Sequence, residues 1–323
     1  MKLFSGSSNY DFAQKVSKHL NVELSDLKIS KFSDGETNIV INESIRKHDC
    51  YVIQPTGSSE TGSVNDNIME LFIMCDALKR GSASTVNVVV PYYGYQRQDR
   101  KDYSRAPISA KVIATCLESL HIDRIIVFDL HAGQIQGFFS NNTPVDKLYV
   151  ECEFIQYIKY NIGTENIVII SPDEGGMKRA VRVASKLGVA SGTVYKERGA
   201  ANKISQMKLM CNVSGKVCII VDDMIDTAGT CSKASHILKE NGAVDVYMMA
   251  CHGVFSGNAF KNIKDSSFKK VVVTNTLDQK RHGPKIEEIG IKERIDVVDV
   301  SWMCAEAIRS SDNGESLNLL YDR

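Results

Sequence analysis

The sequence predicts an α/β fold in which strands and helices alternate to form mostly parallel sheets. Two observations predict it: short runs rich in β-branched residues, and stretches of helical spacing between them. Continuous apolar runs are typical of parallel strands, because helices cover both of their faces. The clearest predicted strands are 86–90, 124–128, 167–170, 217–221 and 270–273.

Helical segments lie between these strands. In the second of them, Ala110, Ile113, Ala114 and Leu117 recur at the spacing of one helix face. The strand–helix pattern occurs twice, with a weak break near residues 141–144, so we expect two α/β domains that meet near residue 148. The predicted helices are 63–79, 109–120, 176–187 and 229–240.

Charge and composition limit the classes of function that the protein can have. The 323 residues include 39 Lys and Arg against 39 Asp and Glu, a balance that argues against a nucleic-acid partner but permits a local site for a small phosphorylated substrate. Apolar runs of about five residues and a polar N-terminus indicate neither a membrane span nor a secretory signal. Nine scattered cysteines without a CxxC pair favour a reducing compartment and a cytoplasmic protein.

Common nucleotide and hydrolase motifs are missing from the sequence. It contains no Walker A loop, GxGxxG, HExxH or GxSxG pattern. If the protein uses ATP, it therefore holds ATP by other means.

The most informative segment spans residues 217–230, where a predicted strand is expected to end in Asp222 and Asp223. Ligands of open α/β sheets bind at the carboxyl ends of strands. Ionised carboxylates can accept hydrogen bonds from a sugar diol, and the following helix start, with Thr227 and Thr230, can hold a phosphate. The alternative is structural: Asp226 caps the helix and the two acids are solvated.

Residues 217–230 resemble the 5-phosphoribosyl-1-pyrophosphate (PRPP) loop of type I phosphoribosyltransferases and PRPP synthetases. Other segments resemble the synthetases, which are also called ribose-phosphate diphosphokinases or pyrophosphokinases (class I-like), and the resemblance extends from Phe4 to Glu315. Those segments are 31–37, 54–56, 65–70, 91–100, 129–139, 171–176 and 274–276.

The resemblance implies a fold and a reaction. The fold is two type I phosphoribosyltransferase-like domains related by internal duplication, here 1–148 on the ATP side and 149–304 with the PRPP loop, while 305–323 packs back on the first. The reaction moves the diphosphoryl group of Mg²⁺-ATP to the C1 hydroxyl of ribose 5-phosphate, giving PRPP and AMP. Dimers assembling into a homohexamer, inorganic phosphate as a candidate activator, and no nucleic-acid or membrane partner are also implied.

The same resemblance assigns roles to individual residues. An aromatic face and carboxylates can bind adenine, and cations can bind phosphates. Each segment also has a structural alternative: residues 32–36 have the composition of a turn, and residues 97–105 have that of a solvated charged surface. The ATP residues are Phe32, Asp34, Gly35, Glu36, Arg97, Gln98, Asp99 and His131. The metal residues are His131 and Asp173, with Asp129 as an outer-shell partner. The ribose 5-phosphate residues are Asp222, Asp223, Asp226, Thr227, Ala228, Gly229 and Thr230. The catalytic residues are Lys196 and Arg198, on a loop whose cations stabilise the transferring phosphates.

The sequence departs from the family pattern at three places. Gly133 stands where many members have a serine linked to regulatory phosphate binding, and the loop after Arg198 is less basic than usual. Residues 140–143 replace a shorter connection, so a cation ligand expected there is missing, although Asp146 remains. Two alternatives therefore stay open: a regulatory homologue without turnover, and a phosphoribosyltransferase that consumes PRPP.

Overall fold

The computed structural model describes residues 1–196 and 207–321 and divides the chain into two compact units. The first unit contains Met1–Tyr149, Asn275–Arg281 and the chain from Asp299 onward, and the second contains Val150–Thr274 and His282–Val298. The predicted α/β fold with parallel sheets is confirmed in both units. The expected division is 1–148 with 305–323 against 149–304; in the structure the C-terminal return begins at Asp299, and a second segment, Asn275–Arg281, also belongs to the first unit.

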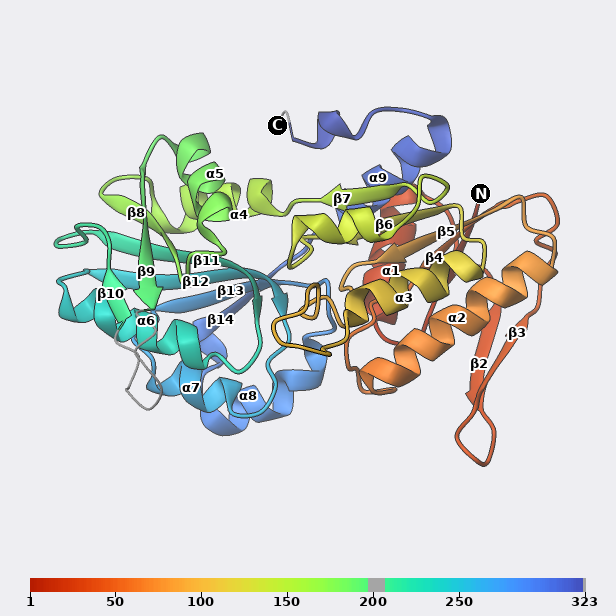
Figure 1. Ribbon diagram of the computed structural model, residues 1–323, viewed down its shortest axis with the longest axis horizontal. Helices are drawn as coiled ribbons and strands as arrows, with labels where there is room; N and C mark the ends of the chain where they lie inside the picture. The colour runs from red at the N-terminus through yellow and green to blue at the C-terminus, as the bar shows by residue number, and fades with distance from the viewer. Residues whose placement is uncertain (197–206, 322–323) are drawn as a thin grey trace. The chain divides into compact units, whose positions relative to one another are not determined.

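The first unit is built on a five-stranded parallel sheet with the order β1-β4-β5-β6-β7 (Figure 1). Its central strands are buried on both faces, as their continuous apolar runs require. The strands are β1 (Lys2–Ser5), β4 (Asp49–Ile53), β5 (Thr85–Val90), β6 (Arg124–Phe128) and β7 (Val145–Leu148).

Helices cover both faces of this sheet. The helices α2 (Val64–Arg80) and α3 (Ser109–Ser119) bury one apolar stripe each against the first face, in a core that includes Leu71, Met74 and Ala114. On the other face, α1 (Tyr10–Leu20) packs against α9 (Ser301–Asn313), and the rings of Phe12 and Phe128 meet edge to face. The last described element is the 3₁₀ turn Leu317–Leu320.

Both returning segments are tied to α1 or to the residue that caps it. Asn9, the N-cap of α1, donates its side-chain amide to the carbonyl of Asn275 at 3.0 Å. Lys280 pairs with Asp11 at 2.8 Å, and Lys15 pairs with Asp299 at 2.9 Å. These contacts explain why the two segments group with the first unit.

A two-stranded hairpin of β2 (Leu27–Lys31) and β3 (Thr37–Ile41) is inserted between β1 and β4. It leans on α2, where Lys31 pairs with Asp66 at 3.1 Å. In Figure 1 its tip projects beyond α2 and lies well away from the loop between β5 and α3.

The second unit has a seven-stranded sheet with the order β10-β9-β8-β11-β12-β13-β14, in which only β10 is antiparallel to its neighbour. The strands are β8 (Ile167–Ser171), β9 (Ala190–Lys196), β10 (Met207–Leu209), β11 (Val217–Ile225), β12 (Asp245–Gly253), β13 (Lys270–Thr274) and β14 (Ile295–Val298).

The helices of the second unit also cover its sheet. The core under α6 (Gly229–Glu240), α7 (Ala259–Asp265) and α8 (Gly283–Ile289) includes Ile220, Met248 and Val271. In Figure 1, α4 (Glu151–Tyr157) and α5 (Met177–Leu187) lie on the opposite side of this sheet. Within the part of the chain that the structure describes, no helix has both the length and the apolar character to cross a bilayer. The nine cysteines are free thiols.

Candidate active site

The acidic pair lies inside β11 and not beyond its end, which corrects the sequence expectation. Pairing with β8 stops at Ile220, whereas pairing with β12 continues to Ile225. The last five residues of β11, Val221–Ile225, therefore have a paired neighbour on one side only. Asp222 and Asp223 lie in this overhang, where the ladder still fixes their backbone.

One arginine faces both carboxylates. Nη1 of Arg179, on the first turns of α5, donates to Oδ1 of Asp222 at 3.3 Å and forms an ion pair with Oδ1 of Asp223 at 3.7 Å. The arginine side chain is 12% exposed and that of Asp223 is 5% exposed. Burial, followed by the neighbouring charge of Asp223, raises the pKa of Asp222 well above its ordinary value, and Arg179 opposes this shift. A site with two carboxylates and one cation favours ligands that donate hydrogen bonds from hydroxyl groups.

Sequence reasoning missed Arg179. Its contact with Asp222 joins residues 43 positions apart, so no local pattern shows it. A signal was present nonetheless: Arg179 directly precedes Ala180, the first buried apolar residue of α5. A cation beside the buried face of a helix needs an acidic partner.

The start of α6 is left without a side-chain cap. Its N-cap residue is Ala228, at a φ of +60°, so Asp226 is not the cap and the structural alternative is wrong. Oδ1 of Asp226 instead accepts a hydrogen bond from the hydroxyl of Ser256, and the carbonyl of Thr227 accepts one from Asn262 at 2.8 Å. The loop is therefore held by residues that lie outside it.

Asp173 lies in the loop between β8 and α5. Its Oδ1 accepts the backbone N–H of Gly176 at 3.0 Å, and its backbone carbonyl accepts the hydroxyl of Ser171 at 2.6 Å. These bonds fix the carboxylate in the turn. Because the residue is exposed, the carboxylate also remains accessible to solvent.

In the first unit, two loops at the carboxyl ends of β5 and β6 are brought together. Gln96 accepts the backbone N–H of His131 at 2.9 Å, and Gln134 donates to Asp99 at 2.7 Å. Gln98 is anchored by the start of α3, where its carbonyl accepts the N–H of Ala110 at 3.2 Å. Arg97 and His131 are exposed at this double loop, whereas Asp129 is 2% exposed.

The tip of the hairpin is the turn that Ser-Asp-Gly predicts. Glu36 N–H donates to Oδ1 of Asp34 at 3.1 Å, and Phe32 N–H donates to the carbonyl of Glu36 at 2.8 Å. Gly35 has a φ of +95°, which only glycine adopts without strain. Phe32 is 56% exposed, and this turn stands apart from the 97–99 loop of its own unit (Figure 1).

The predicted residues thus fall into separate groups. The groups at 97–99 with His131 and Asp129, and at 32–36, belong to the first unit; Asp173 and the group at 222–230 belong to the second. Across residues 1–196 and 207–321, no three His, Cys, Asp or Glu side chains cluster closely enough to hold a metal ion. Lys196 is the last residue of β9, and Arg198 lies outside the described residues.

Two of the departures from the family pattern have a structural context. A Cβ at Gly133 would meet nothing within 4 Å, so geometry does not demand glycine there. Asp146, in β7, pairs with Arg124 of the adjacent strand β6, which gives this carboxylate a structural partner.

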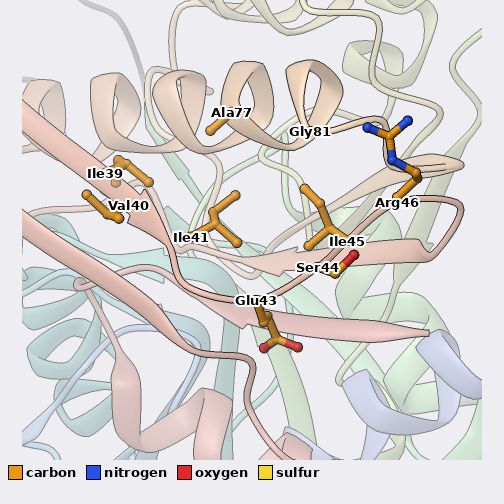
Figure 2. Close-up of a pocket in the computed structure, with 9 residues that line it drawn as sticks. All are labelled: Ile39, Val40, Ile41, Glu43, Ser44, Ile45, Arg46, Ala77 and Gly81. Atoms are coloured by element: carbon orange, nitrogen blue, oxygen red, sulfur yellow. The ribbon is translucent and has the colours of Figure 1, made fainter.

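A pocket of about 450 Å³ lies elsewhere in the first unit (Figure 2). None of the predicted site residues lines it. Figure 2 shows Ile41 and Ile45 in the middle of its lining, with Ile39 and Val40 to one side and Arg46 to the other. The full lining is Ile39, Val40, Ile41, Glu43, Ser44, Ile45, Arg46, Ala77 and Gly81.

Comparisons with known proteins agree with this arrangement. Residues 1–120 match the family model described as the N-terminal domain of ribose phosphate pyrophosphokinase, and residues 197–322 match the phosphoribosyl synthetase-associated domain. Ribose-phosphate pyrophosphokinase A of Dictyostelium discoideum is 44% identical over 99% of this chain and 98% of its own. The crystal structure of phosphoribosylpyrophosphate synthetase from Mycobacterium smegmatis is 35% identical, covers 97% of this chain and 99% of its own, and superimposes with a TM-score of 0.86. The chain therefore belongs to the ribose-phosphate pyrophosphokinase family.

Proposed function

We propose that the protein is an active ribose-phosphate diphosphokinase. The C1 hydroxyl oxygen of ribose 5-phosphate forms a bond to the β-phosphorus of ATP, and the bond from that phosphorus to the α,β-bridging oxygen breaks. The hydroxyl proton is released, and the products are PRPP and AMP. The observation that carries this proposal is the carboxylate pair in β11 that faces Arg179, directly before a helix whose N-cap residue, Ala228, provides no side-chain cap.

The second unit supplies what a sugar phosphate needs. Asp222 and Asp223 accept hydrogen bonds from the ribose hydroxyls, and Arg179 reduces the cost of keeping two carboxylates so close together. The first-turn amides of α6, with the hydroxyls of Thr227 and Thr230, hold the 5-phosphate. The contacts of Asp226 and Thr227 with Ser256 and Asn262 keep this loop in place before the ligand arrives.

The first unit supplies the ATP residues. Arg97 is an exposed cation on a loop anchored by Gln98 and Asp99, which suits it to the phosphates. Phe32, exposed at the hairpin tip, offers an aromatic face for adenine, and Asp34 and Glu36 can accept its exocyclic amine protons.

The donor set fits Mg²⁺. This ion keeps most of its ligands as water and phosphate oxygens and needs only one or two from the protein, so the exposed, separate His131 and Asp173 are sufficient. Asp129 is buried and suits an outer-shell role. When bound, Mg²⁺ would neutralise charge on the phosphate oxygens.

Lys196 and Arg198 are proposed to act on the transferring phosphates, by analogy with the matched family positions. Phosphoryl-type transfer depends mainly on positioning and on stabilisation of developing charge. We expect Lys196→Ala to lower kcat by about 10³-fold while changing ATP affinity little, because such contacts strengthen in the transition state. Equal losses in ATP affinity and kcat would contradict this role.

The test of the reaction is product formation by the purified protein. With ATP, Mg²⁺ and ribose 5-phosphate, AMP and PRPP should appear in equal amounts, as followed by ³¹P NMR. Absence of AMP across a wide range of Mg²⁺ and phosphate concentrations would refute the proposal and favour a regulatory homologue. Consumption of PRPP with a free base would indicate a phosphoribosyltransferase.

We also propose a cytoplasmic homo-oligomer of dimers assembling into a hexamer, with inorganic phosphate as an activator. Sedimentation and initial rates measured on the same samples across phosphate concentrations test both statements. A monomer with full activity, or rates that do not respond to phosphate, would refute the corresponding part.

A further inference from the structure

A buried carboxamide joins the two loops of the first unit that carry the proposed ATP and metal residues. Gln96 lies directly before Arg97 and is 1% exposed. Its Oε1 accepts the backbone N–H of His131 at 2.9 Å. The strands that lead into these loops are neighbours, since Val90 of β5 pairs with Val127 of β6. The bond therefore connects the loop of Arg97, proposed to bind phosphate, to the loop of His131, proposed to bind the metal.

The orientation of this carboxamide is set by its partner. A backbone N–H can be met only by the oxygen of the amide group, so a flipped Gln96 would place two donors against each other. The remaining nitrogen, Nε2, is buried and has no hydrogen-bond partner among the described residues. An unmet buried donor lowers stability. Gln96 is thus a poor choice for stability alone, which points to another reason for its presence.

Backbone geometry supports a functional reason. Tyr95, which precedes Gln96, has a φ of +64°, and Asp129, two residues before His131, has a φ of +29°. Non-glycine residues with positive φ are strained and persist where surrounding contacts hold them, often at functional sites. The carboxamide of Gln96 is a buried contact that connects these two loops.

A second bond joins the same loops at the surface. Nε2 of Gln134 donates to Oδ2 of Asp99 at 2.7 Å, and both residues lie three positions beyond the ends of the first bond. The two loops therefore have one buried and one exposed connection. Loss of either should let the His131 loop shift relative to Arg97.

We propose that Gln96 is a positioning residue that fixes the backbone of His131 against the Arg97 loop, with Gln134 as a weaker second fastening. The proposal rests on the function proposed above, because the residues it aligns are those assigned to ATP and the metal. Gln96 itself contacts neither the substrate nor the reacting atoms.

The test is Gln96→Met, which keeps the length and volume of the side chain but removes the acceptor. We expect a fall in kcat of about five- to tenfold, the size of one lost hydrogen bond, with an unchanged KM for ribose 5-phosphate. Exchange of the His131 amide hydrogen should accelerate by a similar factor. The melting temperature should change little, because the variant removes the unmet Nε2 donor but leaves the His131 N–H without its acceptor.

Gln136→Met is the matched control, since Gln136 bonds only within its own loop, to the carbonyl of Gly133 at 3.0 Å. It should leave kcat within about twofold and the His131 amide unaffected. If Gln96→Met keeps wild-type kcat and His131 exchange, or if it loses activity only in proportion to unfolding, the positioning role is refuted.

The exposed partner provides a second variant that does not touch the core. Gln134→Ala should lower kcat about two- to threefold, and the double variant should lose more than the product of the two single effects, because each bond compensates for the other. If the loss of kcat in the double variant equals the product of the two single losses, the proposal that the two bonds hold the loops together is refuted. An inactive wild-type protein would instead refute the proposed function, and the His131 exchange rate would still report whether Gln96 holds this loop.

Discussion

The two units share one strand order and use it differently. The five strands β1-β4-β5-β6-β7 of the first sheet correspond in chain order and pairing to β8-β11-β12-β13-β14 of the second. In each, a further pair of strands, β2–β3 or β9–β10, is inserted between the first strand and the second. The difference is clearest at the end of the second strand, β4 in one unit and β11 in the other.

At the end of β4 the sheet edge is closed by a buried hydrogen-bond network that includes one carboxylate, Glu70. Gln54, which is fully buried, accepts the hydroxyl of Ser8 at 2.8 Å through Oε1. Its Nε2 donates to Oε1 of Glu70 at 2.8 Å. A Cβ on Gly6 would lie 2.1 Å from Oε1 of Gln54, so the backbone of Gly6 packs directly against this side chain. Both side-chain polar atoms of Gln54 therefore have protein partners.

At the corresponding place β11 carries Asp222 and Asp223 against one arginine, and the pKa of Asp222 is raised by burial and by Asp223. The first unit has one carboxylate, Glu70, whose oxygens accept hydrogen bonds from Gln54 and Ser7, where the second has two carboxylates that face one arginine. Under the proposed function, the same edge serves stability in one unit and ligand binding in the other. The ATP residues proposed for the first unit lie elsewhere, after β5 and β6 and at the tip of the β2–β3 hairpin.

Adding a carboxylate at the end of β4 should lower the stability of the protein, and removing one from β11 should lower its affinity for the ligand. We expect the largest effect from Gln54→Glu, which turns the donor facing Glu70 into a second buried carboxylate. The free energy of unfolding should fall by about 3 kcal/mol or more, measured by denaturant titration.

Gln14→Glu is the matched control, because Gln14 is exposed on α1. Its free energy of unfolding should stay within about 0.5 kcal/mol of the wild type. If Gln54→Glu is equally mild, the network at β4 is not the closed structural feature described above.

The reverse change, Asp222→Asn, should weaken ribose 5-phosphate binding about 10- to 100-fold, because hydrogen bonds to a charged acceptor are lost. Titration calorimetry measures this affinity. Asp245→Asn, at the opposite end of the same sheet, removes only a surface pair with Lys269 and should bind normally. Unchanged affinity in Asp222→Asn would rule out this carboxylate as a ligand of the sugar.

The stability of the same variant should depend on pH. Because the pKa of Asp222 is raised in the folded state, that state binds the proton more tightly than the unfolded chain does. The stability contributed by this group is therefore present at low pH and is lost as pH rises through the folded-state pKa. Asp222→Asn should melt above the wild type at pH 8, and the difference should shrink toward pH 4. A constant difference would contradict the raised pKa.

The smallest effect concerns the hairpin tip. Phe32→Ala should raise the dissociation constant for ATP about fivefold through lost stacking, without changing the free energy of unfolding, because Phe32 is exposed. Tyr160→Ala, at a residue 84% exposed in the second unit, is the control and should not change ATP affinity. Loss of stability in place of affinity would make Phe32 a structural residue.

Local pattern was enough to predict much of the fold. The strand Arg124–Phe128 and the helix Gly229–Glu240 occur with the predicted bounds, because each is set by a run of apolar residues and by flanking turns. The turn at 32–36 was predicted from Ser-Asp-Gly, whose conformational preferences are local.

Features that depend on distant neighbours were not predicted. Two aspartates suggest the end of a strand, but β12 continues the ladder to Ile225 and keeps them within β11. Aspartate is a residue type that often caps a helix, yet the side chain of Asp226 accepts a hydrogen bond from Ser256. The contacts of Arg179 with Asp222 and of Gln96 with His131 join residues more than 30 positions apart, and only the folded sheet brings them together.

Hydrogen exchange with each ligand added separately tests the division between the units most directly. Ribose 5-phosphate alone should slow exchange at Thr227–Thr230 and leave the Arg97–Asp99 loop unchanged. A non-hydrolysable ATP analogue with Mg²⁺ should slow exchange at Arg97–Asp99 and His131 and leave Thr227–Thr230 unchanged. Protection of the first unit by ribose 5-phosphate alone, or no protection at Thr227–Thr230, would contradict the account.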